Sequence, residues 1–172
     1  MPHFFRYLFI LFLTSTSALA QETMVLSNQK TLPATSSWEF VCPTYEYAGK
    51  ATIQIGNNGN GGTLRIDLQV SDSTFYIGGT VYLFLEDGNV ITCTDKNVRS
   101  VSGKFIQSYY ILTPSEISLL KKNKLTDVRF RVYGHQTQFS SPTGFFTSQN
   151  KIKTFGFPDK SYDTMGEIKQ LF

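Results

Sequence analysis

The sequence is poor in the residues that metal proteins and many enzymes use. Of 172 residues, two are His, two are Cys and one is Trp. Zinc and copper sites built on imidazole normally need two or three histidines, so we predict no metal site and no cofactor. There is no G-x-S-x-G motif, and Glu39, Glu46 and Asp95 would have to converge to form a carboxylate site. We therefore predict no catalytic residue and no enzymatic activity; a secreted hydrolase acting on glycans or peptides is an alternative.

Neither sign of charge dominates the chain. Its 16 Lys and Arg side chains are interspersed with 13 Asp and Glu side chains, for a net charge of +3. A nucleic-acid surface requires a basic face. The one basic cluster, Lys121, Lys122 and Lys124, follows a predicted helix, where cations complement the helix dipole. We therefore expect no nucleic-acid partner.

Long apolar runs are absent except near the N-terminus. Arg6 precedes an apolar run from Tyr7 to Leu13, and Ala18-Leu19-Ala20 has the small residues of a cleavage site. This pattern is typical of a signal peptide cleaved after Ala20, and the run is shorter than the roughly 20 residues of a membrane-spanning helix. We predict a signal peptide over 1–20, a secreted or periplasmic protein, and no helical membrane span.

The remaining chain is long enough for one domain with its own core. Residues 21–37 are polar and aperiodic, which predicts a flexible N-terminal segment, and the folded domain is expected over 38–172. Cys42 and Cys93 are the two cysteines. In an oxidising compartment they are candidates for one disulfide, but two buried free thiols are the alternative.

Short alternating runs separated by turn residues predict antiparallel strands. GNNGNGG (56–62) lies between two such runs, 50–56 and 63–70. A phosphate-binding loop would be followed by a helix, whereas here a strand follows, so the glycines are predicted to form a hairpin loop. Further strands are expected over 80–86, 89–94, 104–112 and 125–133.

The Asp87-Gly88 pair favours a two-residue hairpin turn. Counting across that turn predicts that Leu85 pairs with Val90, and that Tyr82 pairs with Cys93. This pairing would place Cys93 inside the sheet.

Two helices are expected. The first spans about 113–123, with Thr113 as N-cap, Pro114 in the first turn and Glu116 closing a capping box. The second is short and C-terminal, with Thr164 as its cap and Glu167 three residues later. The fold class predicted is therefore mainly β: a single antiparallel β-sandwich domain with these two short helices.

Several of these segments together resemble small secreted β-sandwich proteins of unknown function from Gram-negative bacteria. The resemblance rests on the apolar strand, the acid-Gly-Asn hairpin, the capped helix with its lysines and the sided strand after it. These are Val81 to Leu85, Glu86-Asp87-Gly88-Asn89, Thr113 to Leu120, Lys121-Lys122 and Val128-Arg129-Phe130. The resemblance implies a fold and a compartment but no catalytic residue, and residues 134–146 depart from its pattern.

Aromatic residues make up 15% of the chain. Most are expected to lie in the core, but an exposed group could bind a sugar or a partner. Tyr109, Tyr110, Phe145 and Phe146 are the predicted aromatic binding surface. We expect a non-enzymatic module that binds a protein partner or a surface glycan. A small outer-membrane β-barrel protein is the alternative from another class, since the chain is β-rich and ends in Phe172.

Overall fold

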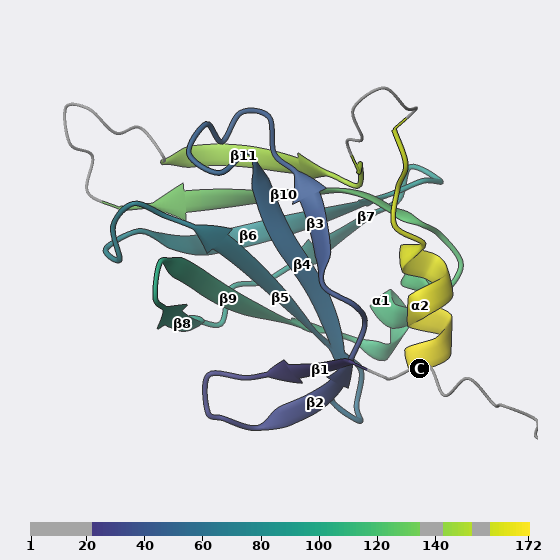
Figure 1. The fold of residues 1–172 in the computed structure, drawn as a ribbon. Helices are drawn as coiled ribbons and strands as arrows, with labels where there is room; N and C mark the ends of the chain where they lie inside the picture. The colour runs from purple at the N-terminus through teal and green to yellow at the C-terminus, as the bar shows by residue number, and fades with distance from the viewer. Residues whose placement is uncertain (1–21, 135–142, 153–158) are drawn as a thin grey trace, which may run out of the picture.

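The structure is a computed structural model that describes residues 22–134, 143–152 and 159–172. Within these ranges the chain forms a mainly-β fold with two short helices (Figure 1), as the sequence predicted. The strands are β1 (Glu22–Val25), β2 (Thr31–Ala34), β3 (Trp38–Val41), β4 (Lys50–Asn57), β5 (Gly62–Gln69), β6 (Tyr76–Leu85), β7 (Val90–Cys93), β8 (Val98–Ser102), β9 (Phe105–Leu112), β10 (Leu125–Tyr133) and β11 (Gly144–Gln149). The helices are α1 (Pro114–Leu120) and α2 (Thr164–Leu171).

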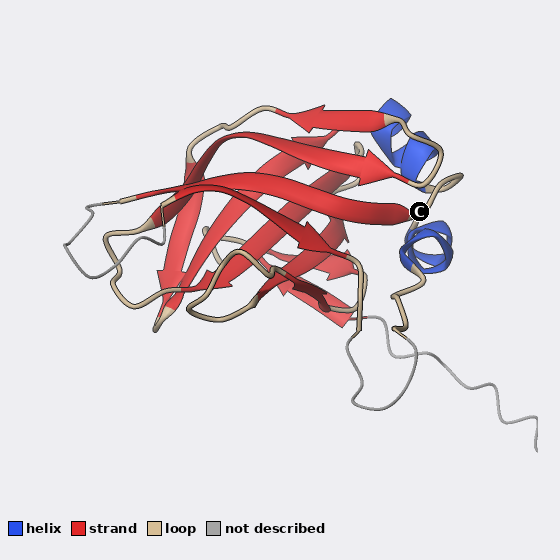
Figure 2. Cartoon of the chain, turned by 90° about the horizontal axis from the view of Figure 1, so that it is seen from above, coloured by secondary structure: helices blue, strands red, loops and turns tan. Residues whose placement is uncertain are grey.

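All the strand pairs are antiparallel and belong to one curled sheet. Its order is β7-β6-β10-β11-β3-β4-β5-β9-β8, with β1 and β2 attached through β4. The sheet folds back on itself, so that β6, β10 and β11 form a layer that faces β4, β5 and β9 (Figures 1 and 2). The two ends of the sheet meet where the Ser108 hydroxyl of β9 donates to the Ile77 carbonyl of β6 at 2.8 Å.

One hydrophobic core fills the space between the two layers. Its largest side chains include Trp38, Phe40, Tyr110 and Phe130, all fully buried. The strands alternate as their sequences predicted: in β5, for example, Leu64, Ile66 and Leu68 all point inward. The two helices lie side by side at one end of the sheet (Figure 1), where Ile117, Leu120 and Ile168 close the core.

The expectation of a flexible segment over 21–37 was wrong for its described part. Residues from Glu22 onward form the β1–β2 hairpin, which packs on the outer face of β4 and β9. Met24 and Ala34 are buried there in a small second cluster with Tyr109. The segment is polar on average, but its few apolar residues lie on one side of each strand, and the sheet supplies the surface that covers them.

The glycine-rich stretch 56–62 forms a hairpin, as predicted, with residues 58–61 as its loop. It joins β4 to β5, whose register pairs Asn57 with Gly62. The next predicted hairpin has the correct strands but the wrong register: Phe84 pairs with Val90, and Val81 with Cys93. The turn contains three residues rather than two. The Leu85 amide donates to the Asn89 carbonyl, the Leu85 carbonyl accepts from the Gly88 amide, and Gly88 takes a φ of 86°. Cys93 is nevertheless inside the sheet.

Helix α1 has the predicted N-terminus. Thr113 is the N-cap; its hydroxyl accepts from the Glu116 amide at 3.3 Å, and the Glu116 carboxylate accepts from the Thr113 amide at 2.7 Å. This reciprocal pair satisfies amides that have no partner within the helix. The helix ends at Leu120, and Lys121 is its C-cap.

Helix α2 forms where expected, but its cap is Asp163 rather than Thr164. The Asp163 carboxylate accepts from the Gly166 amide at 3.0 Å. Thr164 instead accepts from the Leu125 amide at 2.9 Å, so that its hydroxyl joins the helix to β10. The carboxylate of Glu167, three residues after Thr164, accepts hydrogen bonds from Ser36 and Trp38 at the beginning of β3.

The two cysteines are not bonded to each other. Cys42 and Cys93 are both buried free thiols, which is the alternative that the sequence left open. The predicted signal peptide, residues 1–20, lies outside the described residues.

Candidate functional site

The four aromatic residues predicted as a binding surface do not form one. Tyr110 and Phe146 point into the core, because strand alternation turns them inward. Tyr109 points outward, but the β1–β2 hairpin covers it, and its hydroxyl donates to the Val25 carbonyl at 3.2 Å. Only Phe145 is exposed, with 53% of its surface accessible. The prediction of this surface was therefore wrong for three of its four members.

Phe145 belongs instead to a row of stacked arginine and aromatic side chains on the outer face of β6, β10 and β11. We call this set, which consists of Arg129, Phe145, Arg131, Tyr133 and Tyr76, the arginine–aromatic row. The guanidinium carbons of Arg129 and Arg131 lie 5.0 Å and 5.2 Å from the centre of the Phe145 ring. Arg131 also lies 4.6 Å from the centre of the Tyr133 ring, which stacks on Tyr76 at 5.4 Å.

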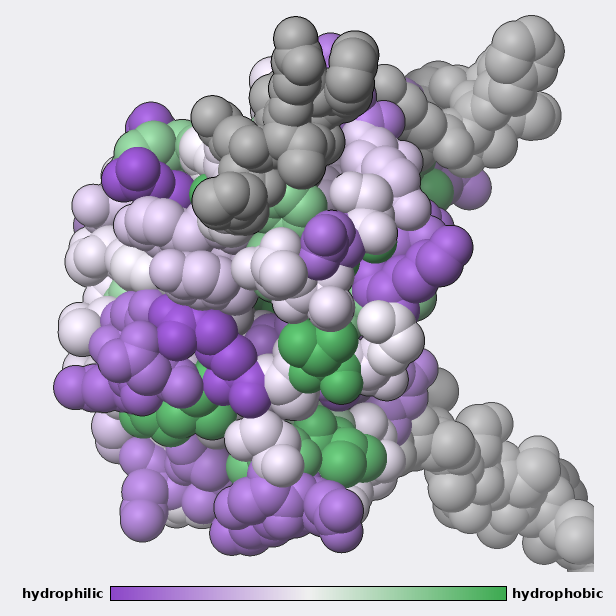
Figure 3. Space-filling view, turned by 90° about the vertical axis from the view of Figure 1, so that its left-hand side faces the viewer, coloured by the Kyte–Doolittle hydropathy of each residue, from purple (hydrophilic) through white to green (hydrophobic). Residues whose placement is uncertain are grey.

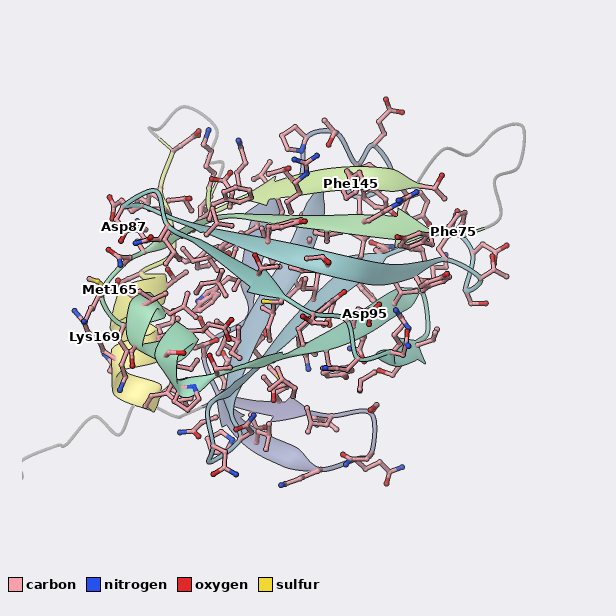
Figure 4. The ribbon with its side chains drawn as sticks, turned by 180° about the vertical axis from the view of Figure 1, so that it is seen from behind. Phe75, Asp87, Asp95, Phe145, Met165 and Lys169 are labelled. Carbon is pink, nitrogen blue, oxygen red and sulfur yellow. The ribbon has the colours of Figure 1, made fainter. Side chains whose placement is uncertain are left out.

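The row follows from strand alternation and register. In β10 the residues Val128, Phe130 and Val132 are buried, so Arg129 and Arg131 lie on the opposite, exposed face. Pairing of β10 with β11 then places Phe145 beside Arg131. Pairing of the same strand with β6 places Tyr76 beside Tyr133. Three strands therefore contribute to one line of side chains, of which Phe145 on β11 is labelled in Figure 4.

Two glycines of β6, Gly78 and Gly79, lie next to the arginine–aromatic row. Gly78 faces Arg131 across the β6–β10 pair. A Cβ atom at Gly78 would lie 2.9 Å from the Arg99 guanidinium and 3.1 Å from the Tyr76 ring, so any larger residue would displace one of them. Gly79 has a φ of 69°, a conformation that glycine adopts without strain, and it forms part of a local register shift in β6.

The guanidinium groups of Arg129 and Arg131 have no anionic partner among the described residues. Neither takes part in an ion pair or a hydrogen bond there; their contacts are with aromatic rings. Stacking on an aromatic face occupies the plane of a guanidinium but leaves the N–H groups at its edge available. Asp127 lies on the same face of β10, two residues before Arg129.

A hollow of about 410 Å³ lies beyond Asp127, at the end of β10 and β11. Its lining residues include the acidic Glu86 and the basic Lys124 and Lys151. The arginine–aromatic row therefore leads from one end of β10 toward a polar depression at the other.

Arg99, which contacts the far end of the row, has a different environment. It lies 5.0 Å from the Tyr76 ring, but its N–H groups also bind the Asp95 carboxylate and donate to the Ile77 carbonyl and the Asn97 side chain. The Asp95 carboxylate in turn accepts from the Gly79 amide at 2.8 Å. Figure 4 shows Asp95 between the ribbons of β6 and β9. Arg99 and Asp95 thus join the two ends of the curled sheet.

The acids considered for a hydrolase site are held apart by other contacts. Glu39 forms an exposed ion pair with Lys50 at 2.7 Å. Asp95 is engaged with Arg99, as described above, and Glu46 lies in the loop between β3 and β4. Within the described ranges, these three carboxylates do not form one site.

The buried titratable groups of the core have raised pKa values. Burial raises the pKa of the Cys42 thiol to about 11 and that of the Cys93 thiol to about 12, the latter with a further contribution from the charge of Glu116. Burial also raises the pKa of Tyr110, whose hydroxyl is enclosed without a hydrogen-bond partner in the part of the chain that the structure describes. These groups are neutral at physiological pH and serve as core side chains.

Two further features concern ligands and membranes. In residues 22–134, 143–152 and 159–172, no three His, Cys, Asp or Glu side chains gather in a way that could hold a metal ion. Neither described helix has the length and apolar character needed to cross a lipid bilayer.

Sequence reasoning missed most of the arginine–aromatic row, although part of its signal was present. The alternation of β10 already placed Arg129 and Arg131 on the outer face. What the sequence did not give was the register with β11 and β6, which brings Phe145 and Tyr76 to the same line. Comparison of the chain with family models, with curated proteins and with solved structures finds no match.

Proposed function

We propose that this protein is a non-catalytic module that binds a glycan in the periplasm or outside the cell, through the arginine–aromatic row. The observation that supports this proposal is an exposed aromatic side chain held between two arginines that have no partner among the described residues. The Phe145 ring lies outside the hydrophobic core, and it contacts the guanidinium groups of Arg129 and Arg131. A flat aromatic ring beside hydrogen-bond donors suits a sugar, which has both an apolar ring face and hydroxyl groups.

The shape of the row favours a chain-like ligand over a folded protein partner. Its members follow the outer face of β10, from Arg129 to Tyr133, over about 13 Å. A stable protein interface uses roughly 20–30 residues on each side, far more than the row provides. On the end of the molecule seen in Figure 3, the hydrophobic residues form separate islands among polar ones rather than one broad patch. A row of this width is suited to a few sugar units of a polysaccharide.

The location of the protein is part of the proposal. It rests on the predicted signal peptide with cleavage after Ala20. Cell fractionation of a copy tagged in an internal loop, together with N-terminal sequencing of the recovered protein, tests it. Soluble periplasmic or medium protein that begins at Gln21 would support the proposal, and uncleaved cytoplasmic protein would overturn it.

Glycan binding is tested by affinity electrophoresis of the purified protein through gels that contain a panel of polysaccharides. Retardation of the wild type by at least one glycan, and its loss in Phe145→Ala, is expected. Phe105→Ala is the matched control, because Phe105 is a 45% exposed phenylalanine on β9, outside the row. Equal loss in both variants would mean that any exposed phenylalanine matters, and would contradict a site at the row.

The same samples separate binding from catalysis. Release of reducing ends from a bound glycan over a long incubation would overturn the non-catalytic part of the proposal and promote a hydrolase. Absence of retardation by every glycan, with capture of a protein partner that depends on Phe145, would replace the glycan with a protein.

A further inference from the structure

The two arginines of the row create an uncompensated positive region. Arg129 and Arg131 are two residues apart on one strand face, which separates their Cα atoms by about 7 Å. Both are exposed, and in the described part of the chain neither forms an ion pair. Like charges at this separation repel each other, and this repulsion opposes the stabilisation that each arginine gains from its aromatic neighbours.

The aromatic rings hold these cations in fixed positions. Arg131 lies between Tyr133 and Phe145, at 4.6 Å and 5.2 Å from the two ring centres. Arg129 contacts Phe145 alone, at 5.0 Å. A guanidinium that contacts an aromatic ring loses less further freedom when it binds a planar anion such as a carboxylate, to which two of its N–H groups can donate. Arg131 is the more constrained of the two.

We infer that the glycan recognised by the row is an acidic polysaccharide, whose sugars carry carboxylate or sulfate groups. This inference rests on the proposed function. The Phe145 ring would pack against the apolar face of one sugar, and Arg131 and Arg129 would bind acidic groups on that sugar and on its neighbour. An acidic group on the sugar would form the ion pairs that Arg129 and Arg131 lack within the described residues, and a neutral sugar would not.

Single-stranded nucleic acid is the other linear polyanion that stacks on aromatic rings. Such a ligand carries a phosphate at every nucleotide and is followed by a positively charged groove. On the outer face of β10 only Arg129 and Arg131 are cationic, and Asp127 precedes them. The short positive region matches a few acidic sugars better than a continuous phosphate backbone. We therefore expect weaker binding to single-stranded nucleic acid than to an acidic polysaccharide.

The test measures the affinity of the purified protein for polygalacturonate, hyaluronate and heparin, with dextran as the neutral polymer and oligo(dT) as the nucleic acid. Binding to at least one acidic polysaccharide about tenfold tighter than to dextran is expected. Affinity should fall as salt is raised, since ion pairs at an exposed site are screened. Arg131→Ala should lose about tenfold or more, Arg129→Ala less, and Arg131→Lys should fall between Arg131→Ala and the wild type.

Two further variants test the role of charge: one is a control outside the row, and the other removes a negative charge beside the row. Lys169→Ala removes one positive charge from an exposed position on α2, away from the row (Figure 4), and should leave affinity unchanged. Asp127→Asn removes the acid on the same strand face and should increase affinity for the acidic polymer. Circular dichroism of each variant confirms that it is folded before its affinity is interpreted.

Each result has one meaning. Equal binding to dextran and to the acidic polymers, still dependent on Phe145, would overturn this inference and leave the proposed glycan function standing. Binding to no polysaccharide would overturn both. Tighter binding to oligo(dT) than to every polysaccharide, with the same arginine dependence, would replace the glycan with nucleic acid.

Discussion

The two ends of β10 place polar groups on the surface for different reasons. Near its start, the C-terminal segment is attached by side chains that are all satisfied: Asn150 donates to the Leu125 and Tyr162 carbonyls and accepts from the Tyr162 amide. Along its outer face, the partners of Arg129 and Arg131 within residues 22–134, 143–152 and 159–172 are aromatic rings. The first region uses polar groups to complete the fold, because burying an unpaired polar group is costly. In the second region the arginine N–H donors have no hydrogen-bond partner in the part of the chain that the structure describes, so they are available to a ligand.

Glu167 on α2 is the clearest example of a polar side chain whose hydrogen bonds complete the fold. Its carboxylate accepts from the Ser36 amide at 2.8 Å, from the Ser36 hydroxyl at 2.9 Å and from the Trp38 indole N–H at 3.0 Å. These bonds join α2 to the beginning of β3. Hydrogen bonds to a charged acceptor are stronger than neutral ones.

We predict that Glu167→Ala has the largest effect of the changes considered, a loss of about 2–3 kcal/mol in the free energy of unfolding. The reason is that three partly buried donors lose their acceptor at once. Urea unfolding measures the loss, and Lys169→Ala on the same helix is the control, expected to stay within about 0.5 kcal/mol of the wild type. A loss as small as that of the control would mean that water replaces the carboxylate without cost.

The comparison is sharpened by two arginines that both contact tyrosine rings. Arg99 is bonded to Asp95, Asn97 and the Ile77 carbonyl, whereas Arg131 has no such partner in the described ranges. We predict that Arg99→Ala lowers the free energy of unfolding by about 1–3 kcal/mol, because it leaves the largely buried Asp95 carboxylate without its cation. Arg131→Ala should change stability by less than about 0.5 kcal/mol while it weakens ligand binding.

Urea unfolding and glycan affinity, measured on both variants, decide this pair. Equal losses of stability would remove the distinction between the two arginines. Such a result would also remove the argument that Arg131 is retained for a ligand.

The difference between these regions also decides what the sequence could reveal. Local features were predictable: the Thr113 cap, the strands on either side of 56–62 and the outward side of β10 depend on residues that are neighbours in the chain. The contact between Ser36 and Glu167 joins positions 131 residues apart, and no local pattern in the sequence predicts it. Side-chain period predicts the face of a strand but not the strand beside it.

The candidate site shows the same limit. Alternation predicts that Tyr109 and Tyr110 lie on opposite faces of β9, but it does not predict that the β1–β2 hairpin covers Tyr109, because that hairpin lies in a segment with no clear period. Phe145 was correctly chosen as exposed, but its arginine neighbours depend on the β10–β11 register. Exposure of one residue could be predicted, and the composition of the site could not.

A third region, on the outer face of β5, has polar side chains that are only partly satisfied. Arg65 Nε lies 3.1 Å from Asp67 Oδ1, yet neither atom has hydrogen-bond geometry with a partner in the described chain. Burial raises the pKa of Asp67 above its ordinary value, against opposing contributions from Arg65 and Gln107. The ion pair therefore compensates only part of the cost of removing the carboxylate from water.

The sign of the resulting pH dependence follows from linkage. Because the folded state binds this proton more tightly than the unfolded state, the contribution of Asp67 to stability falls as pH rises through the interval from the ordinary pKa of 3.8 to the raised value. We predict that the stability of the wild type relative to Asp67→Asn decreases over this interval and is constant above it. Urea unfolding of both proteins across a pH series measures this difference, and a relative stability that rises with pH would mean that Arg65 dominates.

The smallest effects are expected at the cysteines, which belong to the satisfied interior. Their thiols are buried and free, and burial raises their pKa values to about 11 for Cys42 and about 12 for Cys93. Since the thiolate is the reactive form, we predict that an aromatic disulfide reagent labels neither thiol in the native protein over the time in which it labels both in denaturant. Electrophoretic mobility should be the same with and without reductant. A reductant-dependent shift would mean that the two cysteines form a disulfide in the oxidising compartment, and it would contradict the free thiols of the structure.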